Sequence, residues 1–157
     1  MSKEIILSAS LQDYLEAIIE LEEKEGIVRV TDIANKLDIA KASVNQTIKK
    51  LKDMSLVRQE TYGPVELTDE GRHMANRIRQ RHNKLRQFLI EVLGVDSDIA
   101  EKDACLMEHA VSAQTMDRLT DFLCANGYIS AECSNRDSEN DDSWGNAFLI
   151  KYKRFIF

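Results

Sequence analysis

Hydrophobic residues recur at helical spacing along the first third of the chain. Apolar positions three or four residues apart predict a first helix over residues 9–25. The same spacing returns over residues 30–37 and 41–51, on either side of the tripeptide Asp38-Ile39-Ala40. Two short helices joined by so brief a turn predict a helix-turn-helix.

The pattern changes from helical to strand-like after the second of these helices. Residues 56–62 and 65–68 flank Gly63 and the chain's only proline, Pro64, and they predict two short strands joined by a turn. A helix-turn-helix followed directly by a β-hairpin has the element order of a winged helix. We therefore expect residues 1–71 to form a winged helix-turn-helix domain.

Helical spacing resumes in the second half, where it predicts helices over residues 72–93, 96–111 and 113–125. The apolar stripes of these helices exceed what three helices can bury alone, which favours a homodimer. The predicted fold is mainly α with a small β-hairpin wing, and a helical dimerisation domain over residues 72–128 follows the winged helix. Residues 129–157 have the composition of a polar, acidic linker followed by a short aromatic and basic tail.

Composition narrows the class of protein. The chain has 157 residues, 43% of them hydrophobic, which suffices for one substantial core or two small subdomains. It has neither a signal-peptide pattern nor a run of about 20 apolar residues, so we expect a cytoplasmic protein without membrane contact. Three irregularly spaced cysteines indicate reduced thiols rather than a disulfide framework.

The second helix of the helix-turn-helix is the candidate DNA-binding element. The net charge of −6 excludes a uniformly basic surface, so any contact with DNA requires a local positive patch. This helix is rich in lysine, and its Asn and Gln side chains can pair with base edges in the major groove. The residues predicted to face double-stranded DNA are Lys41, Ser43, Asn45, Gln46, Lys49 and Lys50.

The motif Cys105-Leu-Met-Glu108-His109 places three metal-ligating residue types at positions i, i+3 and i+4 of a predicted helix. Their side chains share one face. A helical wheel assigns the opposite, apolar face to Ile99, Ala100, Leu106, Met107, Ala110 and Val111. The alternative for this motif is a buried cysteine beside two solvated polar residues.

Other polar residues at helical spacing are ordinary when taken singly. Asp13 and Glu16 lie close together on the first helix, nearly opposite the centre of its apolar stripe. His82 lies at the shoulder of the apolar stripe of the long helix. Solvated carboxylates and a half-buried structural histidine are the usual interpretation of such positions.

Taken together, the motifs over residues 8–124 resemble the diphtheria toxin repressor family, close to its manganese transport regulator branch. The matching stretches are Asp13-Tyr-Leu-Glu16, Val30-Thr-Asp-Ile-Ala34, Ser43-Val-Asn-Gln-Thr47, Leu67-Thr-Asp-Glu-Gly71, Arg81-His82, Phe88-Leu89 and Cys105-x-x-Glu-His109. The resemblance implies a homodimer that binds a palindromic operator when metal is present, controls metal-homeostasis genes and has no enzymatic activity.

The resemblance also implies a ligand set. Asp13 and Glu16 match carboxylate ligands of the manganese branch, whereas His82, Glu108 and His109 match ligands of both branches. Cys105 is the residue of the iron branch. The ancillary site of the iron branch is incomplete, because Arg86 replaces a glutamate and Glu101 replaces a histidine, although Glu101 stays a candidate ancillary ligand.

The donor types limit the metal. Carboxylate oxygens suit Mn(II) or Fe(II), and a thiolate at Cys105 would favour Fe, Co or Zn. We expect Mn(II) or Fe(II) to activate the protein and Zn(II) or Co(II) to bind in vitro. One alternative is a winged-helix regulator that senses an organic ligand or a thiol oxidant through Cys105, Cys124 or Cys133. A zinc hydrolase is disfavoured, because no catalytic motif or site for a small-molecule substrate is recognisable.

Overall fold

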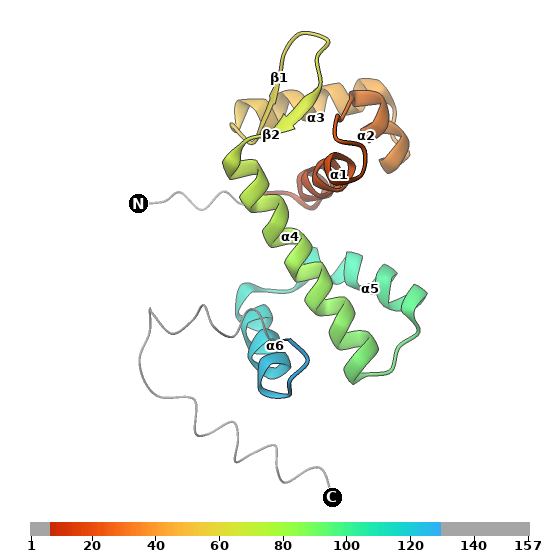
Figure 1. The fold of residues 1–157 in the computed structure, drawn as a ribbon, viewed down its shortest axis with the longest axis vertical. Coiled ribbons are helices and arrows are strands. Elements are labelled where there is room, and N and C mark those ends of the chain that lie inside the picture. Colours follow the sequence, from red (N-terminus) through yellow and green to blue (C-terminus); the bar gives the residue numbers. More distant parts are fainter. Residues whose placement is uncertain (1–6, 130–157) are drawn as a thin grey trace, which may run out of the picture. The chain divides into compact units, whose positions relative to one another are not determined.

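The predicted mainly helical fold with a small hairpin is confirmed. A computed structural model describes residues 7–129 (Figure 1). Its first three helices are α1 (Ala9–Glu25), α2 (Val30–Leu37) and α3 (Lys41–Asp53). The Ser8 hydroxyl caps α1 by accepting a hydrogen bond from the Leu11 amide at 3.4 Å. The predicted helix-turn-helix is therefore present, with α3 two residues longer than expected.

One hydrophobic cluster joins α1, α2 and α3. Val44, Ile48 and Leu51 of α3 are at most 1% exposed, and they belong to the same cluster as Ile33 and Ala34 of α2. Because the buried positions of α3 recur at helical spacing, its remaining positions face outward.

The wing is the antiparallel hairpin of β1 (Val57–Gln59) and β2 (Val65–Leu67). Thr68 connects it to the next helix: its hydroxyl donates to the Ser55 carbonyl at 2.8 Å and accepts from the Gly71 amide at 3.0 Å. Gly71 packs so closely that a Cβ there would lie 1.9 Å from the Leu56 carbonyl oxygen. The hairpin is thus fixed to the start of that helix by close backbone packing.

The long helix, α4 (Asp69–Gln87), begins three residues before the predicted start. Thr68 caps it, and Asp69 and Glu70 stabilise the amino-terminal end of its dipole. The predicted last turn is a separate π-helical turn, η1 (Phe88–Val92), and α5 (Ser97–Ala110) follows. α4 packs against both α1 and α5, so residues from three helices can meet along it.

Of the predicted apolar face of α5, only Ala100 is fully buried. Ile99 and Leu106 are 54% and 74% exposed, whereas Glu108 is only 1% exposed. The fully buried apolar residues of α5 are the alanines Ala100 and Ala104. Small side chains let α5 approach α4 closely, and the buried carboxylate finds polar partners there.

The last described helix is α6 (Ala113–Ala125), as predicted. The chain divides into compact units at Met1–Met116 and Asp117–Phe157. Cys105 is a free thiol, but Cys124 is disulfide-bonded, so the expectation of reduced cysteines is wrong at Cys124. The predicted linker and tail lie outside the described residues, except for Ile129. Across residues 7–129, every helix is too short or too polar to cross a bilayer.

Candidate metal centre

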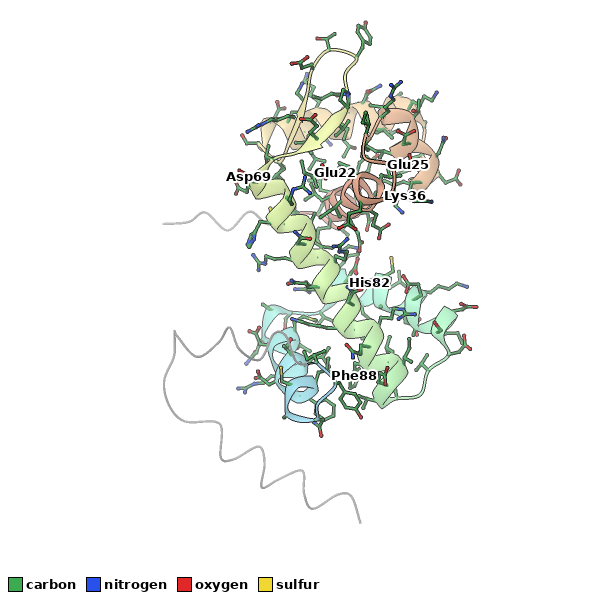
Figure 2. All side chains as sticks on the ribbon, in the orientation of Figure 1. Glu22, Glu25, Lys36, Asp69, His82 and Phe88 are labelled. Carbon is green, nitrogen blue, oxygen red and sulfur yellow. The ribbon has the colours of Figure 1, made fainter. Side chains whose placement is uncertain are left out.

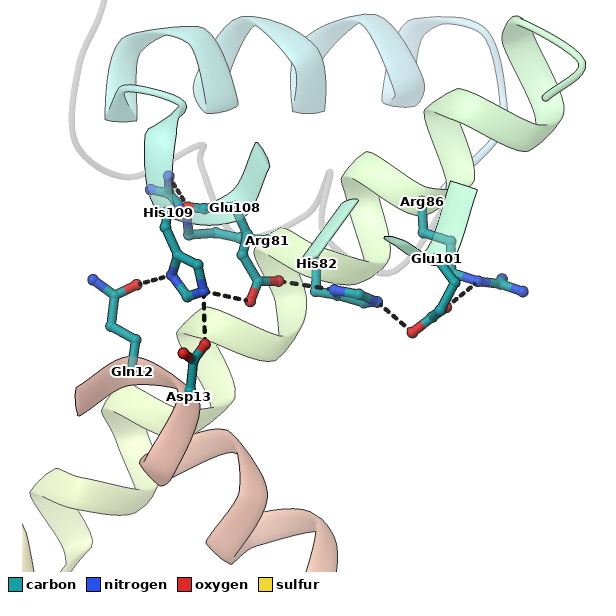
Figure 3. Close-up of polar contacts among 8 residues, drawn as sticks. All are labelled: Gln12, Asp13, Arg81, His82, Arg86, Glu101, Glu108 and His109. Carbon is teal, nitrogen blue, oxygen red and sulfur yellow. Dashed lines mark hydrogen bonds and ion pairs between the residues drawn. The ribbon is translucent and has the colours of Figure 1, made fainter. Parts of the chain in front are cut away.

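Residues from three helices converge beside α4 (Figure 3). α1 contributes Asp13 and Glu16, α4 contributes His82, and α5 contributes Glu108 and His109. Ligand atoms of Asp13, Glu108 and His109 lie within 4.8 Å of one another, as do those of Glu16, His82 and Glu108. Five of the seven predicted metal ligands therefore form two adjoining clusters that share Glu108.

Hydrogen bonds hold the two histidines against these carboxylates. His82 Nδ1 lies 2.8 Å from Glu108 Oε2, and His109 Nε2 lies 2.8 Å from Asp13 Oδ1. The second of these contacts joins α5 to α1 across 96 positions of sequence. Figure 2 shows His82 partway along α4. The site thus spans helices that are distant in the chain.

Glu108 is a buried carboxylate with one unsatisfied oxygen. Its Oε2 meets His82, but its Oε1 has no hydrogen-bond partner among the described residues, although it lies 3.3 Å from His109 Nε2. Leaving a buried acceptor unsatisfied is costly, so such an atom indicates a missing partner. Carboxylate oxygens and imidazole nitrogens around it form a donor set that fits a divalent first-row metal.

Burial and the neighbouring Glu108 shift two pKa values in the site. Burial, followed by the charge of Glu108, raises the pKa of Glu16 from 4.5 to about 7. The hydrogen bond to Glu108 raises the pKa of His82 from 6.5 to about 9, despite the opposing effect of burial. Protons therefore partly balance the negative charge of the metal-free site.

Cys105 and Glu101 are the two predicted ligands that belong to neither cluster. Cys105 is exposed, and partial burial of its thiol, followed by the charges of Glu108 and Asp13, raises its pKa. Glu101 contacts His82 Nε2 at 2.9 Å and Arg86 Nε at 2.7 Å. Arg86 thus pairs with the candidate ancillary ligand.

Two residues at the site were not among the predicted ligands. Gln12 Oε1 accepts a hydrogen bond from His109 Nδ1 at 2.9 Å. The Arg81 guanidinium donates to the backbone carbonyls of Glu108, at 2.8 Å, and Val111. Arg81 directly precedes His82 in a motif that carries the family resemblance, and this motif could have marked Arg81 as part of the site. Nothing in the sequence distinguishes Gln12 from a surface glutamine.

The candidate DNA-binding residues lie on the outward face of α3. Lys41, Ser43, Asn45, Gln46, Lys49 and Lys50 are all exposed. Lys52 Nζ donates to the Gln59 carbonyl at 2.8 Å, which connects α3 to the wing. The helix therefore presents cationic and amide side chains without burying any of the six.

Family models match nearly all of the described chain. Residues 6–65 match "Iron dependent repressor, N-terminal DNA binding domain". Residues 68–125 match "Iron dependent repressor, metal binding and dimerisation domain". The first match contains α1 to α3 and the hairpin's first strand, and the second contains α4 to α6. Both clusters thus combine residues from the two matched regions.

Curated relatives are named as transcriptional regulators. An uncharacterised HTH-type regulator from Methanocaldococcus jannaschii is 35% identical over 118 residues, covering 74% of this chain and 94% of the relative. The regulator MntR of Escherichia coli O157:H7 is 37% identical over 117 residues, covering 74% of this chain and 75% of the relative. MntR of Bacillus subtilis is 35% identical over 114 residues, covering 73% and 80%.

Two similar solved structures are about twice as long as the region that they share with this chain. A manganese-dependent transcriptional repressor in complex with manganese is 33% identical, with a TM-score of 0.66, over 72% of this chain and 52% of that chain. IdeR of T. acidophilum is 26% identical, with a TM-score of 0.66, over 75% of this chain and 55% of that chain. This chain therefore belongs to the iron-dependent repressor family, whose members are metal-dependent, dimeric DNA-binding regulators of transcription and not enzymes.

Proposed function

We propose that this chain is a repressor whose binding to operator DNA is activated by Mn(II) or Fe(II). The ligands would be Asp13, Glu16, His82, Glu108 and His109, with Cys105 as a further donor. The observation that carries the proposal is the buried Glu108, which belongs to both donor clusters and whose Oε1 has no hydrogen-bond partner among the described residues. Relatives named MntR, and a solved relative in complex with manganese, support this metal class.

The clusters connect the DNA-binding region to the rest of the first unit. Asp13 and Glu16 lie on α1, which packs with α2 and α3, whereas Glu108 lies on α5. A bound divalent metal would supply positive charge to these three converging carboxylates. Without that charge the ionised carboxylates repel one another, which weakens the attachment of α1 to α5.

The proposed switch acts through the position of α3. A dimer must place two copies of α3 at the spacing of a palindromic operator. If α1 and the attached α3 vary in position, DNA affinity falls in proportion to the fraction of molecules with the correct spacing. We propose residues 1–71 as the DNA-binding domain and residues 72–128 as the dimerisation domain. The exposed side chains of Leu93, Ile99 and Leu106 offer apolar surface for assembly.

Cys105 and the histidines bear on the choice of metal. Solved relatives hold Mn, Cd or Zn, and we expect Zn(II) and Co(II) to bind this chain in vitro. The carboxylates that raise the pKa of Cys105 are also candidate ligands, so a cation among them would favour its thiolate. In the metal-free protein the raised pKa disfavours sensing by oxidation of Cys105, because the thiolate is the reactive form.

The test is DNA binding with and without metal. Operator duplexes selected from a random library by the Mn(II)-loaded protein would be titrated in Mn(II), in anaerobic Fe(II) and in chelator. We expect tight binding with either metal and at least a tenfold loss in chelator. Equal affinity in all three conditions would overturn the proposal. The control is His73→Gln, because His73 is exposed on α4 outside both clusters and should leave metal activation unchanged.

A further inference from the structure

Each histidine of the site has one ring nitrogen among the ligand carboxylates and the other against a residue outside the two clusters (Figure 3). His109 directs Nε2 to Asp13 and Nδ1 to Gln12. His82 directs Nδ1 to Glu108 and Nε2 to Glu101. The inward nitrogen is therefore Nε2 in one histidine and Nδ1 in the other.

The chemistry of Gln12 determines which nitrogen of His109 carries the proton. The Gln12 side-chain amide donates from Nε2 to the Leu7 carbonyl at 2.9 Å, and a carbonyl can only accept. This contact orients Gln12 Oε1 toward His109 Nδ1, 2.9 Å away. Because an amide oxygen is also only an acceptor, Nδ1 must be the donor. Once a metal replaces the hydrogen bond between Nε2 and Asp13, the lone pair of a neutral His109 lies on Nε2.

Glu101 fixes the tautomer of His82, and this tautomer is the opposite of that in His109. Its Oε1 lies 2.9 Å from His82 Nε2, and its Oε2 lies 2.7 Å from Arg86 Nε. Arg86 is itself held by a 3.0 Å hydrogen bond from its guanidinium to the Ser97 hydroxyl at the start of α5. With Nε2 donating to Glu101, the lone pair of a neutral His82 lies on Nδ1 once a metal replaces the hydrogen bond to Glu108.

Neither outer contact brings an unpaired charge to the site. Gln12 is neutral, and the charge of Glu101 is balanced by Arg86. Each oxygen of Glu101 also has a partner among the described residues. Glu101 is therefore better suited to orienting His82 than to holding an additional cation.

We propose that Gln12 and Glu101 are positioning residues that impose opposite tautomers on the two histidines, with Nδ1–H in His109 and Nε2–H in His82. The inference rests on the proposed metal-binding function. Each metal-binding nitrogen is then set by an acceptor on another helix: Gln12 of α1 orients His109 of α5, and Glu101 of α5 orients His82 of α4. A histidine whose outer nitrogen is fixed is already oriented for a metal.

The direct test is the position of the imidazole protons in the metal-loaded protein. Zn(II) is diamagnetic, so long-range proton–nitrogen correlation spectra of protein labelled with 15N-histidine report each tautomer. The chain has three histidines, and His73→Gln removes the signal from the exposed one. We expect Nδ1–H in His109 and Nε2–H in His82. Finding the same tautomer in both histidines, or the two assignments exchanged, would overturn the proposal.

Variants separate positioning from direct metal binding. Gln12→Met and Glu101→Met remove the acceptor at similar length, and each should weaken Zn(II) binding by about 10- to 100-fold without changing the number of metals bound. Glu101→Gln and Gln12→Glu keep an acceptor oxygen and should retain the tautomer of the facing histidine. A lower number of bound metals in Glu101→Gln would identify Glu101 as a ligand and overturn its positioning role.

A control variant is available, and failure of the positioning role can be distinguished from failure of the proposed metal-binding function. Glu23→Met breaks the 2.5 Å ion pair between Glu23 and Arg79, which also joins α1 to α4 but lies outside the clusters, and it should leave Zn(II) affinity unchanged. If the unaltered protein binds no metal, the proposed function fails and the inference fails with it. If it binds metal and both Met variants bind equally well, only the positioning role is overturned.

Discussion

Glu108 and His82 form a hydrogen bond of 2.8 Å between α5 and α4, with the Glu108 side chain fully buried. This pair lies at the centre of the site, because the other oxygen of Glu108 faces the second donor cluster. A glutamine at position 108 would keep the shape and one acceptor while removing the charge. The two roles of Glu108, structural and metal-binding, can therefore be separated.

We predict that Glu108→Gln folds but binds metal at least about 100-fold more weakly. This loss would exceed the one that usually follows when a residue that only hydrogen-bonds to a metal ligand is replaced. Isothermal titration calorimetry with Mn(II) measures the affinity, and circular dichroism checks the fold. Glu22→Gln is the control, because Glu22 pairs with Arg72 at 2.8 Å outside both clusters. Unchanged Mn(II) affinity in Glu108→Gln would exclude Glu108 as a ligand.

The metal-free protein should lose stability as pH rises. The pKa of Glu16 is raised to about 7 and that of His82 to about 9, so the folded state holds more protons than the unfolded state. The contribution of His82 is complete below pH 6.5 and is lost as pH rises through 9. The raised pKa of Glu16 lowers stability as pH rises from 4.5 to 7.

Thermal melts in chelator between pH 5 and about pH 9.5 measure this dependence. We expect the melting temperature to fall across the range, and the part of the fall below pH 7 to be smaller in Glu16→Gln. With excess Mn(II) the trend should weaken or reverse, because metal competes with protons. A melting temperature that rises steadily with pH in chelator would contradict the assigned pKa shifts.

Cys105→Ser tests whether the thiol binds the metal. If Cys105 is a ligand, the Co(II)-loaded protein should show a sulfur-to-cobalt charge-transfer band that the serine variant lacks. We also expect the variant to lose more affinity for Co(II) than for Mn(II), because thiolate favours Co over Mn. An identical Co(II) spectrum in both proteins would show that Cys105 does not bind the metal.

Lys49→Ala and Lys50→Ala should weaken DNA binding to a similar extent on all sequences. Both lysines are exposed on α3, and each phosphate contact removed should reduce the salt dependence of affinity by about one unit of slope. Fluorescence anisotropy at several salt concentrations measures the slope. Lys24→Ala, at the far end of α1, is the matched control. If all three variants share one slope, these α3 lysines do not contact phosphate.

Gly71→Ala should destabilise the junction between the wing and α4. An added Cβ would lie 1.9 Å from the Leu56 carbonyl oxygen, so backbone must move, at a cost of about 1–3 kcal/mol or more. Denaturant unfolding measures the loss of free energy. At Gly63 the nearest atom to an added Cβ is 3.3 Å away, so Gly63→Ala should cost less. Equal stability of the two variants would contradict the close packing at Gly71.

The helices and the wing were predictable because their signals are local. Helical spacing located α1, α2, α3, α5 and α6, and the glycine and proline between apolar stretches located the hairpin. The start of α4 was missed because Thr68 is a stronger cap than the residues at the predicted start. Local chemistry thus determined most element boundaries to within a few residues.

The site was predictable only where a motif marks a ligand. The buried face of α5 was assigned correctly at Ala100 but wrongly at Ile99 and Leu106. A wheel counts apolar residues, whereas the close approach of the small Ala100 and Ala104 to other helices decides what is buried. The pairing of Arg86 with Glu101 depends on how α4 and α5 pack. The contact between Gln12 and His109 spans 97 positions, which no spacing rule reaches.

Arg81 and His82 are neighbours in sequence that hold α5 in two ways, one through backbone carbonyls and the other through Glu108. The α4–α5 half of the site is therefore held together by contacts that do not involve α1. In the proposed switch, metal affinity then depends on where α1 lies. Thermodynamic reciprocity follows: whatever factor metal adds to operator affinity, operator DNA must add to metal affinity. The protein would therefore bind its metal more tightly on its operator than in free solution.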